Sequence, residues 1–299
     1  MRARNLVARI LVAVAVCGAA APVADAQTWS RRLRPSTGFN DLCGEPIFPG
    51  APNFSFSALH NPDGSDPIVL TPAVCADNPD GVMATWANPG FYAANGFPLP
   101  DPRLVNIPYQ RVPIVVDPSG LRAFVPDHVP GVPQPVPPTR SLPNEPETIS
   151  AFISVGGNMK LKCLRDGTAT VRIRGTGYPP NSVLTVWVIW LNPPDSGLPP
   201  VLPQPLGGAP NHVVADKQGK FTFERTLNFC PMEIQNGSVP LAIDVAKHLD
   251  GGNTYGGVPE VPLQEISFID PDTGDLFTSQ GVGAGMMTVD QGVIPLLIE

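Results

Sequence analysis

The sequence predicts a mostly β protein: an antiparallel β-sandwich with a proline-rich, loop-rich N-terminal half packed on it. Proline is abundant, with 39 residues in 299, and because proline locks φ and lacks an amide donor we expect no long helix. Several segments of the second half alternate apolar and polar residues with a period of two, which is typical of antiparallel sheets with one solvated face. Turn sequences separate these segments at the spacing of a sandwich.

The first residues have the layout of a secretory signal peptide. Met1–Arg9 contains three arginines and no acid, Ile10–Ala21 is apolar but too short to span a bilayer, and Ala24-Asp25-Ala26 is a small-x-small cleavage site. We expect residues 1–26 to be removed, with cleavage after Ala26. The mature chain is then a secreted, periplasmic or cell-surface protein with no membrane span.

The overall charge argues against nucleic acid as a partner. The chain has a formal net charge of −7, and removal of the signal leaves 16 basic and 25 acidic residues. An acidic protein gains no general electrostatic attraction to DNA, RNA or anionic lipid. The expected partners are therefore an extracellular protein or polysaccharide.

The mature chain divides into three parts by composition. Residues 27–125 are loop-rich, with Asn-Pro-Asp-Gly turns at 61–64 and 78–81 and short apolar runs that predict brief strands. Residues 126–146 contain eight prolines, which predict an extended, semi-rigid linker and a domain boundary. Residues 147–299 are expected to form the sandwich.

The strands of the sandwich are predicted from alternation. Over 168–175, Ala169, Val171 and Ile173 share the inner face, and Thr170, Arg172 and Arg174 share the outer one. Over 221–229 the inner residues are phenylalanine and leucine and the outer ones are polar. Over 239–247 the pattern places Leu241, Ile243 and Val245 inward and Asp244 outward.

The segment 183–191 is apolar on both faces. One face holds Leu184, Val186, Val188 and Trp190, and the other holds Val183, Trp187, Ile189 and Leu191. One face covers the sandwich core. An exposed Val186–Trp190 strip would be an unusual surface patch, so the other face needs a cover. We expect the N-terminal half to supply it, with a partner chain as the alternative.

Four cysteines remain in the mature chain. An even number in an exported protein predicts two disulfides. Three pairings are possible, and proximity in sequence favours Cys43–Cys75 and Cys163–Cys230. A zinc site is disfavoured because no two cysteines have a metal-binding spacing and no histidine is near them.

Two motifs resemble bacterial secreted immunoglobulin-like domains. These are Arg174-Gly-Thr-Gly-Tyr-Pro-Pro-Asn-Ser182 and, after a hydrophobic strand, Ala215-Asp-Lys-Gln-Gly-Lys-Phe221. The resemblance covers roughly residues 160–250 and implies an immunoglobulin-like sandwich. Such domains usually serve as adhesive, spacer or binding modules. This chain departs from the pattern because its domain is single and carries long insertions at 192–210 and 250–262.

Candidate ligand-binding residues cluster after the last alternating segment. The loop 248–256 holds His248, Asp250, Asn253 and Tyr255 between glycines, and polar loops at a sandwich end are common binding sites. Trp86 is a further candidate because an exposed aromatic ring stacks on sugars. The alternative for the loop is a flexible, hydrogen-bonded turn.

Calcium is the only cofactor for which the sequence offers ligands. Asp270, Asp272 and Asp275 lie within six residues, and calcium prefers such oxygen ligands. The EF-hand spacing fails, however, and the alternative is an Asx-type turn between two strands.

These observations favour an exported, non-enzymatic structural or binding module that recognises an extracellular protein or polymer. No catalytic or nucleotide-binding motif is present in the sequence. Two alternatives remain: a secreted hydrolase acting on polysaccharide or peptide through His248 or carboxylates, and a calcium-stabilised surface protein.

Overall fold

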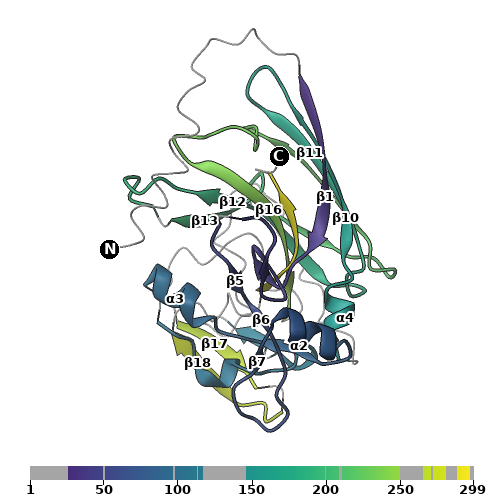
Figure 1. The fold of residues 1–299 in the computed structure, drawn as a ribbon, viewed down its shortest axis with the longest axis vertical. Helices are drawn as coiled ribbons and strands as arrows, with labels where there is room; N and C mark the ends of the chain where they lie inside the picture. The colour runs from purple at the N-terminus through teal and green to yellow at the C-terminus, as the bar shows by residue number, and fades with distance from the viewer. Residues whose placement is uncertain are drawn as a thin grey trace.

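The computed structural model describes residues 26–49, 51–96, 98–112, 114–116, 146–198, 200–208, 211–249, 265–270, 272–280 and 288–296. The protein is mostly β, with antiparallel, curled sheets (Figure 1). One nine-stranded sheet dominates, and three small sheets and short helices lie at one end of it. No helix in the described ranges is long and apolar enough to cross a membrane.

The large sheet has the strand order β13-β12-β16-β19-β1-β10-β11-β15, and β14 also pairs with β12. Its strands are β1 (Gln27–Pro35), β10 (Gly156–Cys163), β11 (Ala169–Thr176), β12 (Val183–Leu191), β13 (Val201–Pro205), β14 (His212–Val214), β15 (Phe221–Leu227), β16 (Val239–His248) and β19 (Thr288–Pro295).

Strand β1 joins the two layers into which this sheet curls. Residues 27–33 pair with β10, whereas Arg34 and Pro35 pair with β19. The layer of β1, β10, β11 and β15 and the layer of β12, β16 and β19 share one buried core. The sheet therefore begins in the region 27–125, and the expected boundary at 126–146 does not separate the sheet from the N-terminal half.

Three small sheets and five short helices form the rest of the described chain. The sheets consist of β2 (Gly38–Phe39), β3 (Asp41–Leu42), β4 (Glu45–Pro46) and β5 (Phe54–Ser55); β6 (Ser57–Leu59), β7 (Ile68–Val69) and β8 (Met83–Thr85); and β9 (Ile114–Val116), β17 (Glu265–Ile269) and β18 (Leu276–Gln280). The helices are α2 (Pro72–Asp77), α3 (Pro89–Asn95), α4 (Ile149–Phe152) and the 3₁₀ turns η1 (Pro102–Leu104) and η2 (Tyr109–Arg111).

The small elements enclose a second hydrophobic core. Leu59, Met83 and Tyr109 from the N-terminal region pack there with Phe152 of α4 and Phe268 of β17. Residues from both ends of the chain thus build this core. This second core therefore combines the region 27–125 with residues of the interval 147–299.

Alternation predicts the burial of β11 and β15 correctly. Along β11 buried and exposed residues alternate without interruption, and along β15 Phe221, Phe223 and Leu227 are buried. Strand β16 differs, because its residues from Pro240 to His248 are all buried. Asp244, expected outside, is only 4% exposed. Leu241 falls at a register shift against β12 and packs in a different cluster from Ile243 and Val245.

Both faces of β12 are buried, as its doubly apolar pattern predicts. Val186, Val188 and Trp190 point into the core between the two layers. Trp187 and Ile189 pack on the other side against Phe39 and Phe48 of the N-terminal region. The N-terminal region therefore covers the Trp187 face, and the Val186–Trp190 strip faces the core between the two layers.

The two motifs that carry the family resemblance dock onto each other. The ring of Tyr178 packs edge-on against Phe221, with 5.2 Å between centroids, and the Tyr178 amide donates to the Gly219 carbonyl. Gly219 has φ of 70°, and a Cβ there would lie 2.1 Å from the Tyr178 carbonyl oxygen. Glycine is therefore required in this turn.

Two disulfides join the cysteine pairs that sequence proximity favours. Cys43 pairs with Cys75 of α2, and Cys163 at the end of β10 pairs with Cys230 after β15. The second bridge lies in the core of the large sheet, where both cysteines are buried. Each disulfide thus ties segments within one of the two regions of the protein.

Candidate functional site

His248, the predicted centre of a binding loop, lies inside the protein at the end of β16. It is 1% exposed, and its Nε2 is 2.8 Å from Thr185 Oγ1. Trp187 Nε1 donates to the same hydroxyl at 2.8 Å. His248 is therefore part of a buried chain of hydrogen bonds and presents no surface to a ligand. Asp250, Asn253 and Tyr255 lie outside the described residues.

Burial also changes the acid-base behaviour of His248. Desolvation, with a smaller contribution from the charge of His212, lowers the pKa of His248 to about 3. The folded protein thus keeps this imidazole neutral at pH values where the unfolded chain, with an ordinary histidine pKa, takes up a proton. A neutral, buried imidazole does not serve the hydrolase hypothesis, which required His248 to reach a substrate.

Acidification is expected to destabilise the protein through His248. Because the unfolded state binds more protons between about pH 6.5 and 3, the free energy of unfolding falls as pH falls through this window. From pH 7 to 5, His248 alone should remove about 2 kcal/mol. Urea unfolding at both pH values should show a smaller loss in His248→Gln than in the unmodified protein. An identical loss in both would contradict the prediction.

The other candidate residues that the structure describes lie next to strands of the small sheets. Trp86 follows β8 and is partly buried. Asp270 Oδ1 accepts the backbone amides of Asp272 and Thr273, which is the Asx-type turn that the sequence allowed. Asp272 forms an ion pair with Arg111. Among the described residues, no three His, Cys, Asp or Glu side chains are grouped so that they could hold a metal ion.

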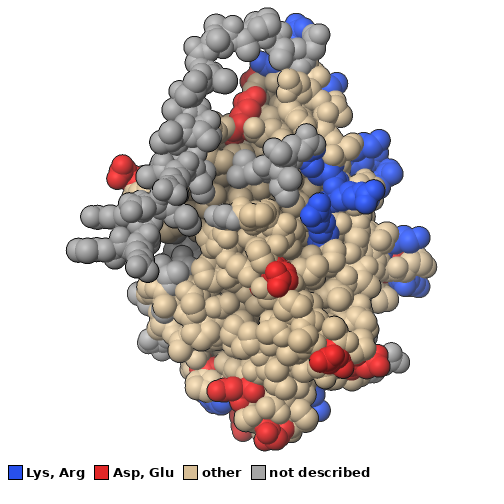
Figure 2. All heavy atoms as spheres, viewed as in Figure 1, with Lys and Arg blue, Asp and Glu red and all other residues tan. Residues whose placement is uncertain are grey.

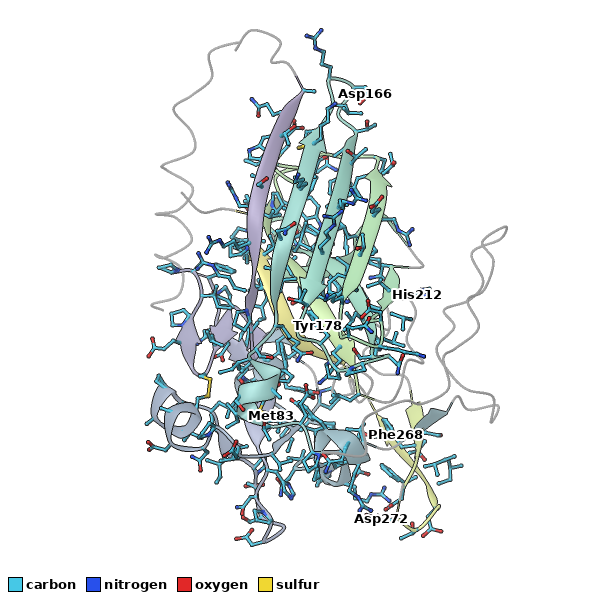
Figure 3. All side chains as sticks on the ribbon, turned by 90° about the vertical axis from the view of Figure 1, so that its right-hand side faces the viewer. Met83, Asp166, Tyr178, His212, Phe268 and Asp272 are labelled. Carbon is cyan, nitrogen blue, oxygen red and sulfur yellow. A yellow bond between two sulfur atoms is a disulfide. The ribbon has the colours of Figure 1, made fainter. Side chains whose placement is uncertain are left out.

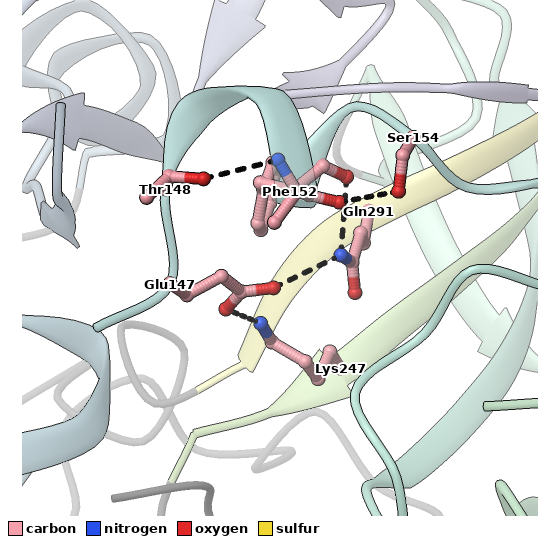
Figure 4. A network of polar contacts seen from close by, with 7 residues as sticks. Glu147, Thr148, Phe152, Ser154, Lys247 and Gln291 are labelled. Atoms are coloured by element: carbon pink, nitrogen blue, oxygen red, sulfur yellow. Dashed lines mark hydrogen bonds and ion pairs between the residues drawn. The ribbon is translucent and has the colours of Figure 1, made fainter. Parts of the chain in front are cut away.

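A buried polar network connects the two cores (Figure 4). Lys247 of β16 forms an ion pair with Glu147, and the side chains of Lys247 and Glu147 are 1% and 10% exposed. Gln291 Nε2 donates to Glu147 Oε1 at 3.2 Å and to the Phe152 carbonyl at 3.1 Å. The rings of Tyr109 and Phe152 lie about 5 Å from the Lys247 ammonium. The network thus anchors the segment before α4 to the large sheet.

Burial lowers the pKa of Lys247, and the Glu147 carboxylate opposes this by stabilising the ammonium. The ammonium is enclosed by its partner and by two aromatic rings, so it acts within the protein rather than on a ligand. We assign this network a structural role.

The outward face of β1, β10, β11 and β15 carries a regular array of exposed polar and charged side chains. Figure 3 shows this face from the front. Strand register aligns twelve exposed side chains in three rows across these strands. The rows are Arg32, Asn158, Arg174 and Thr222; Ser30, Lys160, Arg172 and Glu224; and Thr28, Lys162, Thr170 and Thr226. We call these twelve residues the cationic face.

The cationic face concentrates positive charge on an acidic protein. It carries five Lys or Arg residues and a single acid, Glu224, whereas the whole chain has a net charge of −7. Figure 2 shows Lys and Arg gathered on the side of the molecule where β1, β10 and β11 lie. The other six members of the face are all Ser, Thr or Asn.

The net charge of the chain does not indicate this surface, because it sums the charges of the whole molecule. The local signal in the sequence is a cation at every second position, in Lys-Leu-Lys at 160–162 and in Arg-Ile-Arg at 172–174. Alternation identifies these side chains as outward-facing, but only strand pairing brings Arg32 into the same surface.

The chain matches no family model, no curated protein and no solved structure.

Proposed function

We propose that this protein is an exported, non-enzymatic binding module that recognises an extracellular polymer through the cationic face. The observation that carries the proposal is the segregation of five cations onto one exposed sheet face of a net-acidic protein. Such a surface attracts an anionic partner and speeds its association, because electrostatic complementarity acts over roughly the Debye length of about 8 Å.

Features elsewhere in the chain support export. The first 26 residues have the charge, length and cleavage site of a signal peptide, and two disulfides fit an oxidising compartment. The resemblance of residues 160–250 to secreted immunoglobulin-like domains supports the same proposal, because such sandwiches commonly serve as binding modules. In this proposal the curled sheet is an immunoglobulin-like scaffold, and its outer face carries the site.

The arrangement of like charges also favours a binding role. Lys160 lies directly opposite Arg172 in the β10–β11 register. Like charges at opposed positions destabilise a sheet, so folding alone does not account for this pair. An anionic partner that lies across the two strands relieves the repulsion. Residue pairs that lower the stability of the fold, such as these opposed cations, are expected at binding sites.

The test is binding to an immobilised anionic polymer, dextran sulfate, with neutral dextran as the reference. The Lys160→Glu/Lys162→Glu variant should lose affinity for dextran sulfate by about tenfold or more, because both side chains lie on the cationic face. The control variant, Lys217→Glu/Arg111→Glu, changes the net charge equally at exposed positions off this face and should keep its affinity within about twofold.

Two outcomes would contradict the proposed function. One is the absence of binding to dextran sulfate at physiological salt. The other is an equal loss of affinity in the two charge-reversal variants, which would show that net charge rather than the cationic face governs the interaction.

A further inference from the structure

We infer that the ligand of the cationic face is an extended acidic polysaccharide, with its anionic groups held by the cations and its hydroxyls by the Ser, Thr and Asn side chains between them. This inference rests on the proposed function, and it adds the chemical class of the ligand. The residues that lie between the cations indicate this class.

All twelve positions of the cationic face are charged or hydrogen-bonding. Besides the five cations and Glu224, they are Thr28, Ser30, Asn158, Thr170, Thr222 and Thr226. Hydroxyl and amide groups both donate and accept hydrogen bonds, which matches the hydroxyl groups of sugars. A charge-only interaction would not need these groups to fill every position that a cation does not occupy.

The face lacks the side chains that other polyanions use. Proteins that bind single-stranded nucleic acid stack its bases on aromatic rings, and peripheral membrane binders insert apolar groups into the lipid. Neither aromatic nor aliphatic residues occur among the twelve positions. Trp29 of β1 packs against the inner core instead. A sugar polymer that offers charges and hydroxyls fits this composition better than a nucleic acid or a lipid surface.

The dimensions of the face also suit an extended chain. Neighbouring strands are about 4.8 Å apart, and outward residues of one strand are about 6.7 Å apart. Three rows across four strands therefore cover about 14 Å by 13 Å. Within this area Lys160, Lys162 and Arg172 are adjacent. Asn158 and Thr170 lie at opposite corners of the block of six residues that β10 and β11 contribute to the face. Several sugar units of one chain can contact both kinds of side chain at once.

The charge pattern predicts a separation of stability from binding. In the same row as the like-charged pair, Arg172 forms an ion pair with Glu224 across the β11–β15 register. Lys160→Glu would replace repulsion with a second ion pair to Arg172. The urea midpoint of this variant should rise, or remain equal, while its affinity for an acidic polysaccharide falls. A residue chosen only for folding would not give this combination.

The deciding experiment compares sugar and non-sugar polyanions. The probes are polygalacturonate and dextran sulfate, which carry carboxylates and sulfates on sugars, and polyphosphate, oligodeoxythymidylate and anionic phospholipid vesicles. The variant Ser30→Ala/Asn158→Ala/Thr170→Ala leaves every charge in place and changes only exposed side chains. Urea unfolding of each variant verifies that it is folded.

We expect the triple-alanine variant to lose about tenfold in affinity for at least one of the two polysaccharides and to bind polyphosphate within twofold of the unmodified protein. Provided that dextran sulfate still binds, unchanged polysaccharide binding by the triple-alanine variant would overturn the inference and leave the proposed function standing. So would a non-sugar probe that binds at least as tightly as both polysaccharides. Failure of the unmodified protein to bind dextran sulfate would overturn both.

Discussion

The Glu147→Ala variant is expected to lose about 3–5 kcal/mol of the free energy of unfolding, because it leaves the buried Lys247 ammonium without its anionic partner. Lys247 is 1% exposed, and its surroundings include the rings of Tyr109 and Phe152. These rings offer a weak attraction to the cation, but they do not replace a carboxylate. Denaturant unfolding at pH 7 measures the loss.

A second variant separates two effects of Glu147→Ala: the loss of the charge that pairs with Lys247 and the loss of the other contacts of the Glu147 side chain. In Glu147→Gln/Lys247→Met both charges are absent, so no charge is left buried and the loss should be clearly smaller than in Glu147→Ala. High pH should also restore part of the stability of Glu147→Ala. Burial lowers the pKa of Lys247, so the unfolded chain binds more protons below the ordinary lysine value and stability rises with pH. A deficit that is equal in both variants and independent of pH would contradict this account.

Removal of the disulfide between Cys163 and Cys230 is expected to cost about 4.4 kcal/mol, because the bridge restricts the unfolded chain. The bridge closes a loop with a sequence separation of 67, compared with 32 for Cys43–Cys75. In the loop-entropy model a longer loop restricts the unfolded chain more, so loss of the shorter bridge should cost slightly less, about 3.7 kcal/mol.

The measurement is urea unfolding of Cys163→Ala/Cys230→Ala and of Cys43→Ala/Cys75→Ala. Both cysteines of the first pair are buried in the core between the two layers, so their replacement also removes packing. The loss of the cross-link and the loss of packing both lower the free energy of unfolding. A larger loss in the Cys43–Cys75 variant would show that the N-terminal region, rather than the large sheet, limits the stability of the protein.

Local patterns predicted several features of this fold correctly. The alternation in β11 and β15 identified their buried sides, because side chains of a strand point to opposite faces whatever its neighbours are. The doubly apolar pattern of β12 predicted that both of its faces are covered. The pairing of the cysteines followed from their proximity in sequence.

The burial of Asp244 and His248 was not predicted from the sequence, for a definite physical reason. Asp244 and His248 have the polarity of exposed residues, yet β16 lies between β12 and β19 with both of its faces covered. A covered strand does not show a one-sided alternation. The small elements that lie over this part of the sheet come from distant parts of the chain, and no local pattern records their position.

The sequence by itself thus determined the β class, the inward and outward sides of β11 and β15, and the residue types from which a binding surface could be built. The tertiary structure alone decided that β1 joins the two layers, that Lys247 is paired with Glu147, and that Arg32, Lys160 and Arg172 share one face. The reason is that side-chain periodicity is a property of a single strand, whereas strand order and register depend on pairing between segments far apart in the sequence.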